Sequence, residues 1–387
     1  MALLTRGQPG AVRAVAEAIR SGRPPQALLL VGPAHVGKTT LALDLAAGLL
    51  CQAASPDERP CWACAACRRV AHGNHPDLHR IAPEGAGGQI RIGQVQALAS
   101  ELVLLPLEGP LRVAIVVEAH RLNPDAQNAF LKTLEEPPPG TCLVLCVEDE
   151  SAMLPTVRSR AARLRLGPLP TGVLVDLLSE RGVADAARAA ALARAAGGRP
   201  GLALALATQP EAGLVEARLL RRLLDLAAAD RRTRLGAATE LLLDALALSR
   251  AERSGAERLE ADAGTASPAP AAPEESPSVS DVEDATSGRS VRGLSPADRR
   301  LAAARLIEIW RGLGRDLLVA ARGGQGRVRR TELLDELAVT AEGLSLQALV
   351  TFLQRLDALE AALESYANPE LLVDSLLLAW PRPRQAA

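Results

Sequence analysis

The segment GPAHVGKTT, from Gly32 to Thr40, has the spacing GxxxxGK[ST] of a phosphate-binding loop. Gly32 and Gly37 would let backbone amides face phosphate oxygens, and the following helix N-terminus adds partial positive charge. Lys38 would contact the β- and γ-phosphates and Thr39 would hold magnesium, with Thr40 completing the nucleotide-binding set. A glycine turn that binds nothing is the alternative, but the spacing and the flanking elements favour a phosphate loop.

Hydrolysis of a bound nucleotide requires a carboxylate that holds magnesium at the end of a neighbouring strand. The candidate strand reads RVAIVVEAH, and the metal-holding position immediately before Glu118 is Val117. An apolar side chain cannot coordinate magnesium or anchor its water shell. We therefore expect a degenerate metal site at Val117 and Glu118, with nucleotide binding but no efficient hydrolysis. A hydrolysing motor would need a replacement carboxylate, such as Glu118 or Glu148.

Four of the six cysteines follow the spacing C-x9-C-x2-C-x2-C, namely Cys51, Cys61, Cys64 and Cys67. This spacing predicts a structural zinc module over residues 51–67, because four sulfur ligands leave no open coordination position. A redox dithiol is the alternative for a C-x2-C pair. Cys142 and Cys146 lie on a predicted strand and are expected to be buried thiols.

Apolar runs and helix-capping signals position these groups in the chain. Short apolar runs predict buried strands, and the Asn123-Pro124 pair predicts a helix start. Strands are expected at residues 26–31, 113–117 and 142–147, and helices at 38–50 and from Asn123 to the prolines at 137–139. This alternation predicts a parallel sheet covered by helices over about the first 165 residues.

Helical periodicity replaces strand patterns from about Thr171 onward. A short helical block runs to about Ala207, a longer one begins near Glu211, and Asn368-Pro369 opens a last helix. Residues 251–294 include a stretch rich in Pro, Ser, Ala and acids, with few large apolar side chains to offset the entropy of ordering. We interpret residues 251–294 as a disordered insertion, with a linker between independent domains as the alternative.

Two further groups of residues have a less specific meaning. Arg158 and Arg160 precede another short strand, and a pair of loop arginines is most often solvated. His75, Asp77 and His79 have the residue types of a metal or acid–base site. Because four cysteines already saturate a zinc ion, a turn that orders the cysteine loop against the sheet is the preferred interpretation.

Taken in order, these segments resemble the delta-prime subunit family of the bacterial clamp loader, with the gamma/tau ATPase as its nearest cousin. The resemblance covers residues 1 to about 205. Besides the phosphate loop and the four-cysteine insertion, it includes GNHPDLHRI at 73–81, NAFLKTLEEPP at 128–138 and LPTVRSR at 154–160. The C-terminal block matches only in type and position.

The resemblance implies a fold of the AAA+ type: an α/β P-loop domain, a small helical lid and an all-α collar. We place these domains at residues 1–168, 169–207 and 208–387. It implies that Arg160 of the Ser159-Arg160 pair reaches an ATP bound on an adjacent subunit, where a guanidinium neutralises developing charge. Lys132 would pack or pair near that subunit boundary. The implied partners are gamma/tau and delta subunits, with the sliding clamp and primed DNA contacted through the complex.

Several positions depart from the pattern of an active ATPase. The family's magnesium aspartate is Val117, its polar sensor is replaced by Val147-Glu148, and its lid arginine falls at Gly201, where Arg199 is no simple substitute. The cysteine that usually follows Ser-Arg is Ala161. These changes predict a stator-like, non-catalytic subunit that loads the clamp with its neighbours. It would contribute to DNA-directed DNA polymerase activity only as part of the holoenzyme; the alternative is a gamma/tau-type motor.

Composition excludes some other functions. The net charge is −1, and the chain has two Phe, three Trp and one Tyr, which argues against a single-strand binder that stacks bases and against a zinc-dependent nucleic-acid module. Without a signal sequence or an apolar run near the roughly 20 residues of a membrane span, a cytoplasmic protein with no membrane partner is expected. Lys38 and Lys132 are the only lysines, and both lie in motifs. Whether the loop holds ATP or ADP with magnesium, or stays empty, is left open.

Overall fold

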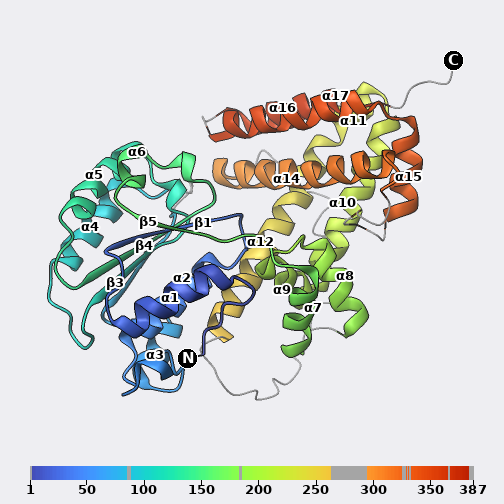
Figure 1. The fold of residues 1–387 in the computed structure, drawn as a ribbon. Helices are drawn as coiled ribbons and strands as arrows, with labels where there is room; N and C mark the ends of the chain where they lie inside the picture. Colours follow the sequence, from blue (N-terminus) through green and yellow to red (C-terminus); the bar gives the residue numbers. More distant parts are fainter. Residues whose placement is uncertain are drawn as a thin grey trace. The chain divides into compact units, whose positions relative to one another are not determined.

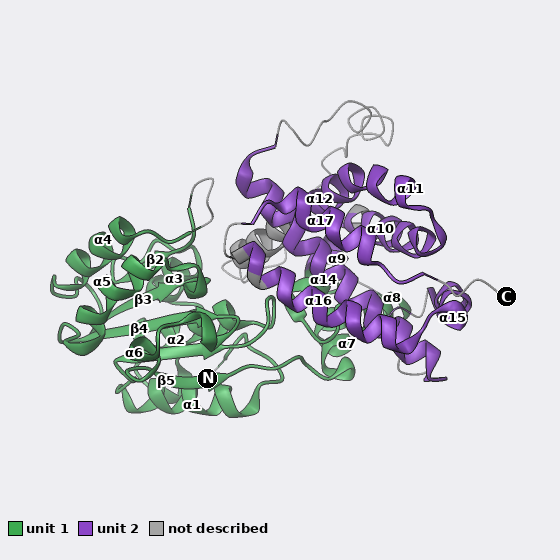
Figure 2. Ribbon diagram, turned by 90° about the horizontal axis from the view of Figure 1, so that it is seen from above, with its two compact units in different colours: residues 1–204, 256–269 green, residues 205–255, 270–387 purple. Residues whose placement is uncertain are grey.

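The structure is a computed structural model (Figure 1). It describes residues 2–84, 89–182, 185–262, 294–324, 328, 330, 333–364 and 367–382. By its internal contacts the chain divides into unit 1, residues 1–204 with 256–269, and unit 2, residues 205–255 with 270–387 (Figure 2). The division of the chain into P-loop domain, lid and collar stays a prediction.

Unit 1 contains a five-stranded parallel sheet in the order β2-β3-β4-β1-β5. Its strands are β1 Ala27–Val31, β2 Leu78–Ile81, β3 Arg112–Val116, β4 Thr141–Val147 and β5 Ala162–Arg165. Every residue of β1, β3 and β4 is buried, as their continuous apolar runs require in a sheet covered on both faces. The predicted strands are confirmed to within one residue at each end.

Helices cover both faces of this sheet (Figure 1). Helices α1 Pro9–Ser21 and α2 Lys38–Leu50 pack on the face that carries Leu28 and Leu30, together with the cysteine segment. Helices α4 Ile92–Leu102 and α5 Pro124–Glu135 pack on the opposite face, which carries Leu29. The short helices α3 Ala65–Ala71 and α6 Pro155–Arg158 complete this part. The predicted α/β P-loop architecture is confirmed.

Helices take over after β5. Unit 1 continues with α7 Thr171–Glu180 and α8 Ala186–Ala195, and α9 Pro200–Thr208 begins in it. Unit 2 is helical where the structure describes it. Its helices are α10 Pro210–Ala228, α11 Arg231–Gly236, α14 Pro296–Ala321, α15 Leu334–Gly343, α16 Leu346–Glu364 and α17 Pro369–Ala379, together with α12 Ala238–Asp262 up to residue 255. The rings of Trp310, Phe352 and Trp380 meet in its core, with centroids 4.8–5.9 Å apart.

The interpretation of residues 251–294 as a disordered insertion is wrong for its first part. Helix α12 continues to Asp262, because the sequence AERSGAERLEAD is rich in the strong helix formers Ala, Glu, Arg and Leu. The Pro- and Ser-rich remainder, residues 263–293, lies outside the described residues. Among the described helices none alone is long and apolar enough to cross a membrane, although the bent pair Leu334–Gly343 and Leu346–Glu360 passes that test together.

Candidate functional site

The phosphate loop lies between β1 and α2, at the carboxyl end of β1. The Gly32 amide donates to the Val147 carbonyl at 3.1 Å, and a Cβ at Gly32 would lie 2.3 Å from the Leu166 carbonyl oxygen. Gly37 takes a left-handed φ of 102° immediately before α2, a conformation that glycine adopts without strain. The two motif glycines are therefore required by the backbone path of the loop.

Lys38 folds back over this loop, and its Nζ donates to the carbonyls of Gly32 and Pro33, each at 2.7 Å. Burial lowers the pKa of Lys38, while the charges of Glu148 and Glu118 act in the opposite direction. Thr39 and Thr40 lie half-buried in the first turn of α2. The structure thus brings the predicted nucleotide-binding residues together. Phosphate oxygens could replace the two carbonyls as acceptors of the Lys38 ammonium.

The magnesium position follows directly after β3 and is apolar. The Val117 amide donates to the Ile81 carbonyl at 2.9 Å, and its side chain packs against the core cluster on the α1/α2 face of the sheet. Glu118 has a left-handed φ of 50°, and its carboxylate lies 3.5 Å from Arg121 Nε. The structure shows no carboxylate at the position of Val117, so the site lacks the usual magnesium anchor.

His120 and Glu148 lie beside these groups. His120 Nε2 is 3.9 Å from Glu148 Oε1. Burial lowers the pKa of His120 to about 4, and the charges of Arg121 and Lys38 add to this. The imidazole is therefore neutral at pH 7. The carboxylates of Glu118 and Glu148 are close enough to Lys38 to affect its pKa. A hydrolysing motor would need one of them to replace the carboxylate missing at Val117.

Helix α9 contacts the phosphate loop through backbone groups. The Gly201 amide, in the first turn of α9, donates to the His35 carbonyl at 3.0 Å. A Cβ at Gly201 would lie 3.2 Å from that oxygen, which is closer than ordinary packing allows. Arg199 donates from its Nε to the Ala196 carbonyl at 3.1 Å. Gly201, where the resemblance places a lid arginine, therefore lies against the phosphate loop without a side chain.

Arg160 lies just after α6 and outside the phosphate loop. Its Nη1 donates to the Thr156 carbonyl at 2.9 Å and to Ser159 Oγ at 3.2 Å, and its Nη2 lies 2.7 Å from Glu135 Oε1. Arg160 is exposed, whereas Arg158 is half-buried on α6. Sequence reasoning missed Glu135 as the ion-pair partner of Arg160. The available signal was its place in the KTLEEPP segment, at the end of a helix that precedes the arginine pair in the same resemblance.

The four predicted ligand cysteines converge, although Cys51 is ten residues from Cys61. All four sulfur atoms lie within 4.8 Å of one another, with Cys51–Cys61 at 3.6 Å and Cys61–Cys67 at 4.0 Å. Tetrahedral zinc with bonds of about 2.3 Å would separate its sulfur ligands by about 3.8 Å. Backbone amides of Ala53, Cys64 and Cys67 donate to cysteine sulfurs at 3.4 Å. The cluster is compatible with a zinc site.

The interpretation of His75, Asp77 and His79 as a turn that orders the cysteine loop stays a prediction, and the structure shows which groups Asp77 and His79 contact. The Asp77 carboxylate accepts three backbone amides of the loop at Leu107, Glu108 and Gly109, at 2.6–2.9 Å. His79 contacts Glu101 through Nδ1 at 2.6 Å and Arg112 through Nε2 at 3.0 Å. Spacing shows that polar groups recur, but not which loop their hydrogen bonds reach.

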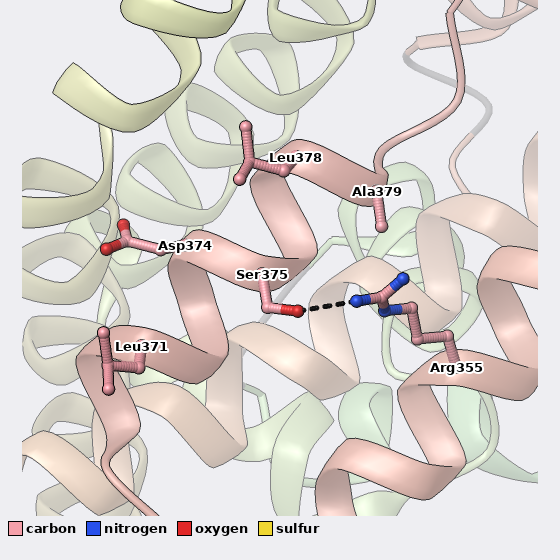
Figure 3. A pocket seen from close by; sticks show the side chains of 6 residues that line it. All are labelled: Arg355, Leu371, Asp374, Ser375, Leu378 and Ala379. Carbon is pink, nitrogen blue, oxygen red and sulfur yellow. Dashed lines mark hydrogen bonds between the residues drawn. The ribbon is translucent and has the colours of Figure 1, made fainter.

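A pocket lies in unit 2, between α16 and α17 (Figure 3). It encloses about 370 Å³, and Arg355 Nη2 donates to Ser375 Oγ at 2.8 Å beside it. Its lining residues are Arg355, Leu371, Asp374, Ser375, Leu378 and Ala379. With one guanidinium and one carboxylate, it offers no cradle for phosphate, so the loop in unit 1 is the candidate nucleotide site.

A phosphate loop on a parallel sheet of order β2-β3-β4-β1-β5, followed by helical segments, defines a P-loop protein of the AAA+ type. Residues 7–170 match a family model described as DNA polymerase III, delta subunit. The resemblance to clamp-loader subunits of the delta-prime and gamma/tau kind is thus confirmed over the N-terminal part of the chain.

Known proteins give the extent of this similarity. DNA polymerase III subunit delta' of Bacillus subtilis is 35% identical over 176 residues, 46% of this chain and 52% of that protein. Subunit tau of Escherichia coli is 33% identical over 208 residues, 52% of this chain and 32% of that protein. A gamma subunit-related structure from Thermotoga maritima is 16% identical, covers 95% of this chain and 98% of its own, and has a TM-score of 0.42. The chain spans about half the length of the delta' relatives it matches.

Proposed function

We propose that this chain is a non-catalytic, delta-prime-like subunit of a DNA polymerase III clamp loader, which supplies Arg160 in trans to the ATP site of a neighbouring subunit. The observation that carries the proposal is Val117, which packs into the core where a motor would hold magnesium. Gly201 supports it, because the lid reaches the phosphate loop without a cationic side chain. Arg160, by contrast, is exposed, and its side chain contacts Thr156, Ser159 and Glu135 among the residues that the structure describes.

The partners proposed for this function are the gamma/tau ATPase and delta subunits, with the sliding clamp and primed DNA reached through the assembled complex in the cytoplasm. The proposal rests on the similarity to delta' and tau proteins. The phosphate loop would hold ATP or ADP through Gly32, Gly37, Lys38, Thr39 and Thr40. Binding there would stabilise unit 1 by linkage without turnover.

Structural zinc is the second cofactor of this proposal. Cys51, Cys61, Cys64 and Cys67 would bind one ion with four thiolates, because the sulfur spacing fits a tetrahedral site and backbone amides already point at three of the sulfurs. Such an ion would fasten the end of α2 to α3. With no open coordination position it would have no part in catalysis.

A motor of the gamma/tau kind is the second candidate, favoured only by the closeness of Glu118 and Glu148 to Lys38. Magnesium-dependent ATP hydrolysis separates the two. The chain is assayed alone and assembled with its ATPase partner, as wild type, Lys38→Ala and Arg160→Ala. Arg165→Ala is the matched control, because that exposed arginine follows in β5 and pairs with Glu150.

The proposal predicts no turnover by the chain alone and a complex slowed about tenfold or more by Arg160→Ala. Arg165→Ala should leave turnover unchanged. Hydrolysis by the chain alone that disappears in Lys38→Ala would instead establish a motor. A complex that Arg160→Ala leaves unaffected would refute the trans arginine.

A further inference from the structure

Helix α5 is fixed to the segment that carries Arg160 at two separate points. Near the start of α5, the buried side chain of Gln127 accepts the Leu154 amide at 2.7 Å and donates to the Ala152 carbonyl at 3.1 Å. At the end of α5, Glu135 pairs with Arg160. The two contacts lie on either side of α6 and connect the segment that carries Arg160 to α5.

The guanidinium of Arg160 is contacted at both terminal nitrogens. Nη1 donates to the Thr156 carbonyl and to Ser159 Oγ of its own segment, and Nη2 forms an ion pair with Glu135. Arginine carries five N–H donors in a rigid fork, and the Nε–H of Arg160 has no partner among the described residues. A donor for an incoming anion is therefore still present while the plane of the group is held.

Exposure sets the strength of this arrangement. The side chains of Arg160 and Glu135 are 35% and 51% exposed, and exposed ion pairs are weak and easily exchanged. Glu135 can therefore limit the rotamers of a long side chain without trapping it. A phosphate group, with more charge and more acceptor oxygens than one carboxylate, can compete for the same donors.

We infer that Glu135 is a positioning residue for Arg160: it orients the guanidinium before the neighbouring nucleotide arrives and so reduces the ordering that engagement requires. The inference rests on the proposed function of Arg160 and extends it to a residue on another helix. Glu136, the next residue on the chain, is also exposed but forms no ion pair with Arg160. Glu136 is therefore a matched control for substitutions of Glu135.

The experiment is a double-mutant cycle on ATP turnover by the complex assembled with the gamma/tau-type partner. The variants are Glu135→Ala, Glu135→Asp, Glu136→Ala, Arg160→Ala and the double variant Glu135→Ala with Arg160→Ala. Glu135→Ala should lower kcat about fivefold with little change in the KM for ATP, and Glu135→Asp should recover part of the loss. Glu136→Ala should match wild type.

The cycle is expected to show that Glu135→Ala has no further effect once Arg160 is alanine, because Glu135 acts through the guanidinium. An equal loss in both backgrounds would show a structural role and overturn the inference, as would full activity of Glu135→Ala in a complex that Arg160→Ala slows. A complex indifferent to Arg160→Ala would overturn the proposed function and, with it, the inference. Melting temperatures of the single variants identify any loss of folding.

Discussion

The carboxyl end of β3 illustrates how single residues determine what this site can do. Val117 contributes to the core instead of binding a metal, and His120, three residues later, is half-buried and uncharged at pH 7. Burial costs a cation more than a neutral ring, and the positive charges of Arg121 and Lys38 add to that cost. A neutral imidazole therefore fits beside Lys38, whereas an imidazolium would destabilise the fold.

This burial predicts a pH dependence of stability. The folded pKa of His120 is about 4 and the unfolded one about 6.5, so below pH 6.5 the unfolded chain takes up a proton that the folded chain refuses. The stability contributed by neutral His120 is present above pH 6.5 and is lost as the pH falls toward 4. Between pH 7 and pH 5 the loss should be about 2 kcal/mol.

Urea unfolding at pH 7 and pH 5 tests this prediction. His120→Gln should lose less stability on acidification than wild type, by about the 2 kcal/mol assigned to the ring. His72→Gln is the control, because His72 is exposed at the end of α3. An equal pH dependence in wild type and His120→Gln would contradict the assignment. Protonation of other groups affects all three proteins alike, so the comparison isolates His120.

At the scale of elements, the sequence predicted the strands, the helix start and the cysteine cluster, because each depends on residues close together in the chain or on a specific spacing. The apolar runs of β1 and β4 could only be strands buried on both faces, and the Asn123 side chain caps α5 by accepting the Ala126 amide at 2.8 Å. The Cys spacing located the cluster because thiolates have few other shared uses. Gly201 was recognised as lacking a side chain, but its amide bond to the phosphate loop depends on tertiary structure.

Two contacts that the sequence did not predict have the same cause in longer-range structure. Asp77 bonds to a loop about 30 residues away, and no local pattern identifies that partner. Glu135 and Arg160 are likewise separated by a strand and α6. The error at α12 has a local cause instead. The predicted insertion, drawn from the Pro-rich composition further along the chain, began at residue 251 and so included a segment of good helix formers that continues α12 to Asp262.

We expect Asp77 to be the main residue that stabilises the conformation of the loop before β3. Asp77→Ala would leave three backbone amides without their acceptor and should destabilise unit 1 by about 2–3 kcal/mol. Hydrogen exchange at Leu107, Glu108 and Gly109 should accelerate before the rest of the sheet is affected. Asp57→Ala, an exposed carboxylate, is the control. Unchanged protection of these amides in Asp77→Ala would contradict the role.

The cysteine cluster gives a second prediction for an element. The chain purified without chelator should contain about one zinc per molecule, and Cys64→Ser should lose most of it because the remaining three sulfurs cannot complete the tetrahedron. Cys142→Ala should retain its zinc, since Cys142 lies buried in β4 and outside the cluster. Metal content by mass spectrometry decides the matter. A metal-free wild-type chain with four reduced thiols would refute the zinc site.

At the scale of the whole molecule, the two units have separate anchors. In unit 2 the fully buried guanidinium of Arg234 donates to carbonyls at both ends of the unit's sequence, including Ala227, Leu377 and Trp380 at 2.5–3.2 Å. It thereby joins α11 to the end of α17. Trp380 in turn donates from Nε1 to the Leu223 carbonyl at 2.9 Å.

Removing Arg234 should therefore unfold the two units separately. Arg234→Met leaves several buried carbonyls unsatisfied and should destabilise unit 2 by about 3 kcal/mol or more. The tryptophans allow this to be seen, because Trp310 and Trp380 belong to unit 2 and Trp62 to unit 1. In a Trp62→Phe background, fluorescence follows unit 2 alone, while circular dichroism follows both units.

Denaturant unfolding of Arg234→Met in this background should give a fluorescence midpoint well below that of the parent, and a circular dichroism curve with two steps. The later step should keep the parent midpoint, since it reports a sheet that Arg234 does not touch. Arg231→Met, at an exposed position of the same helix, should unfold like the parent. One shared transition at a lowered midpoint would instead show that the two units fold as a single cooperative body.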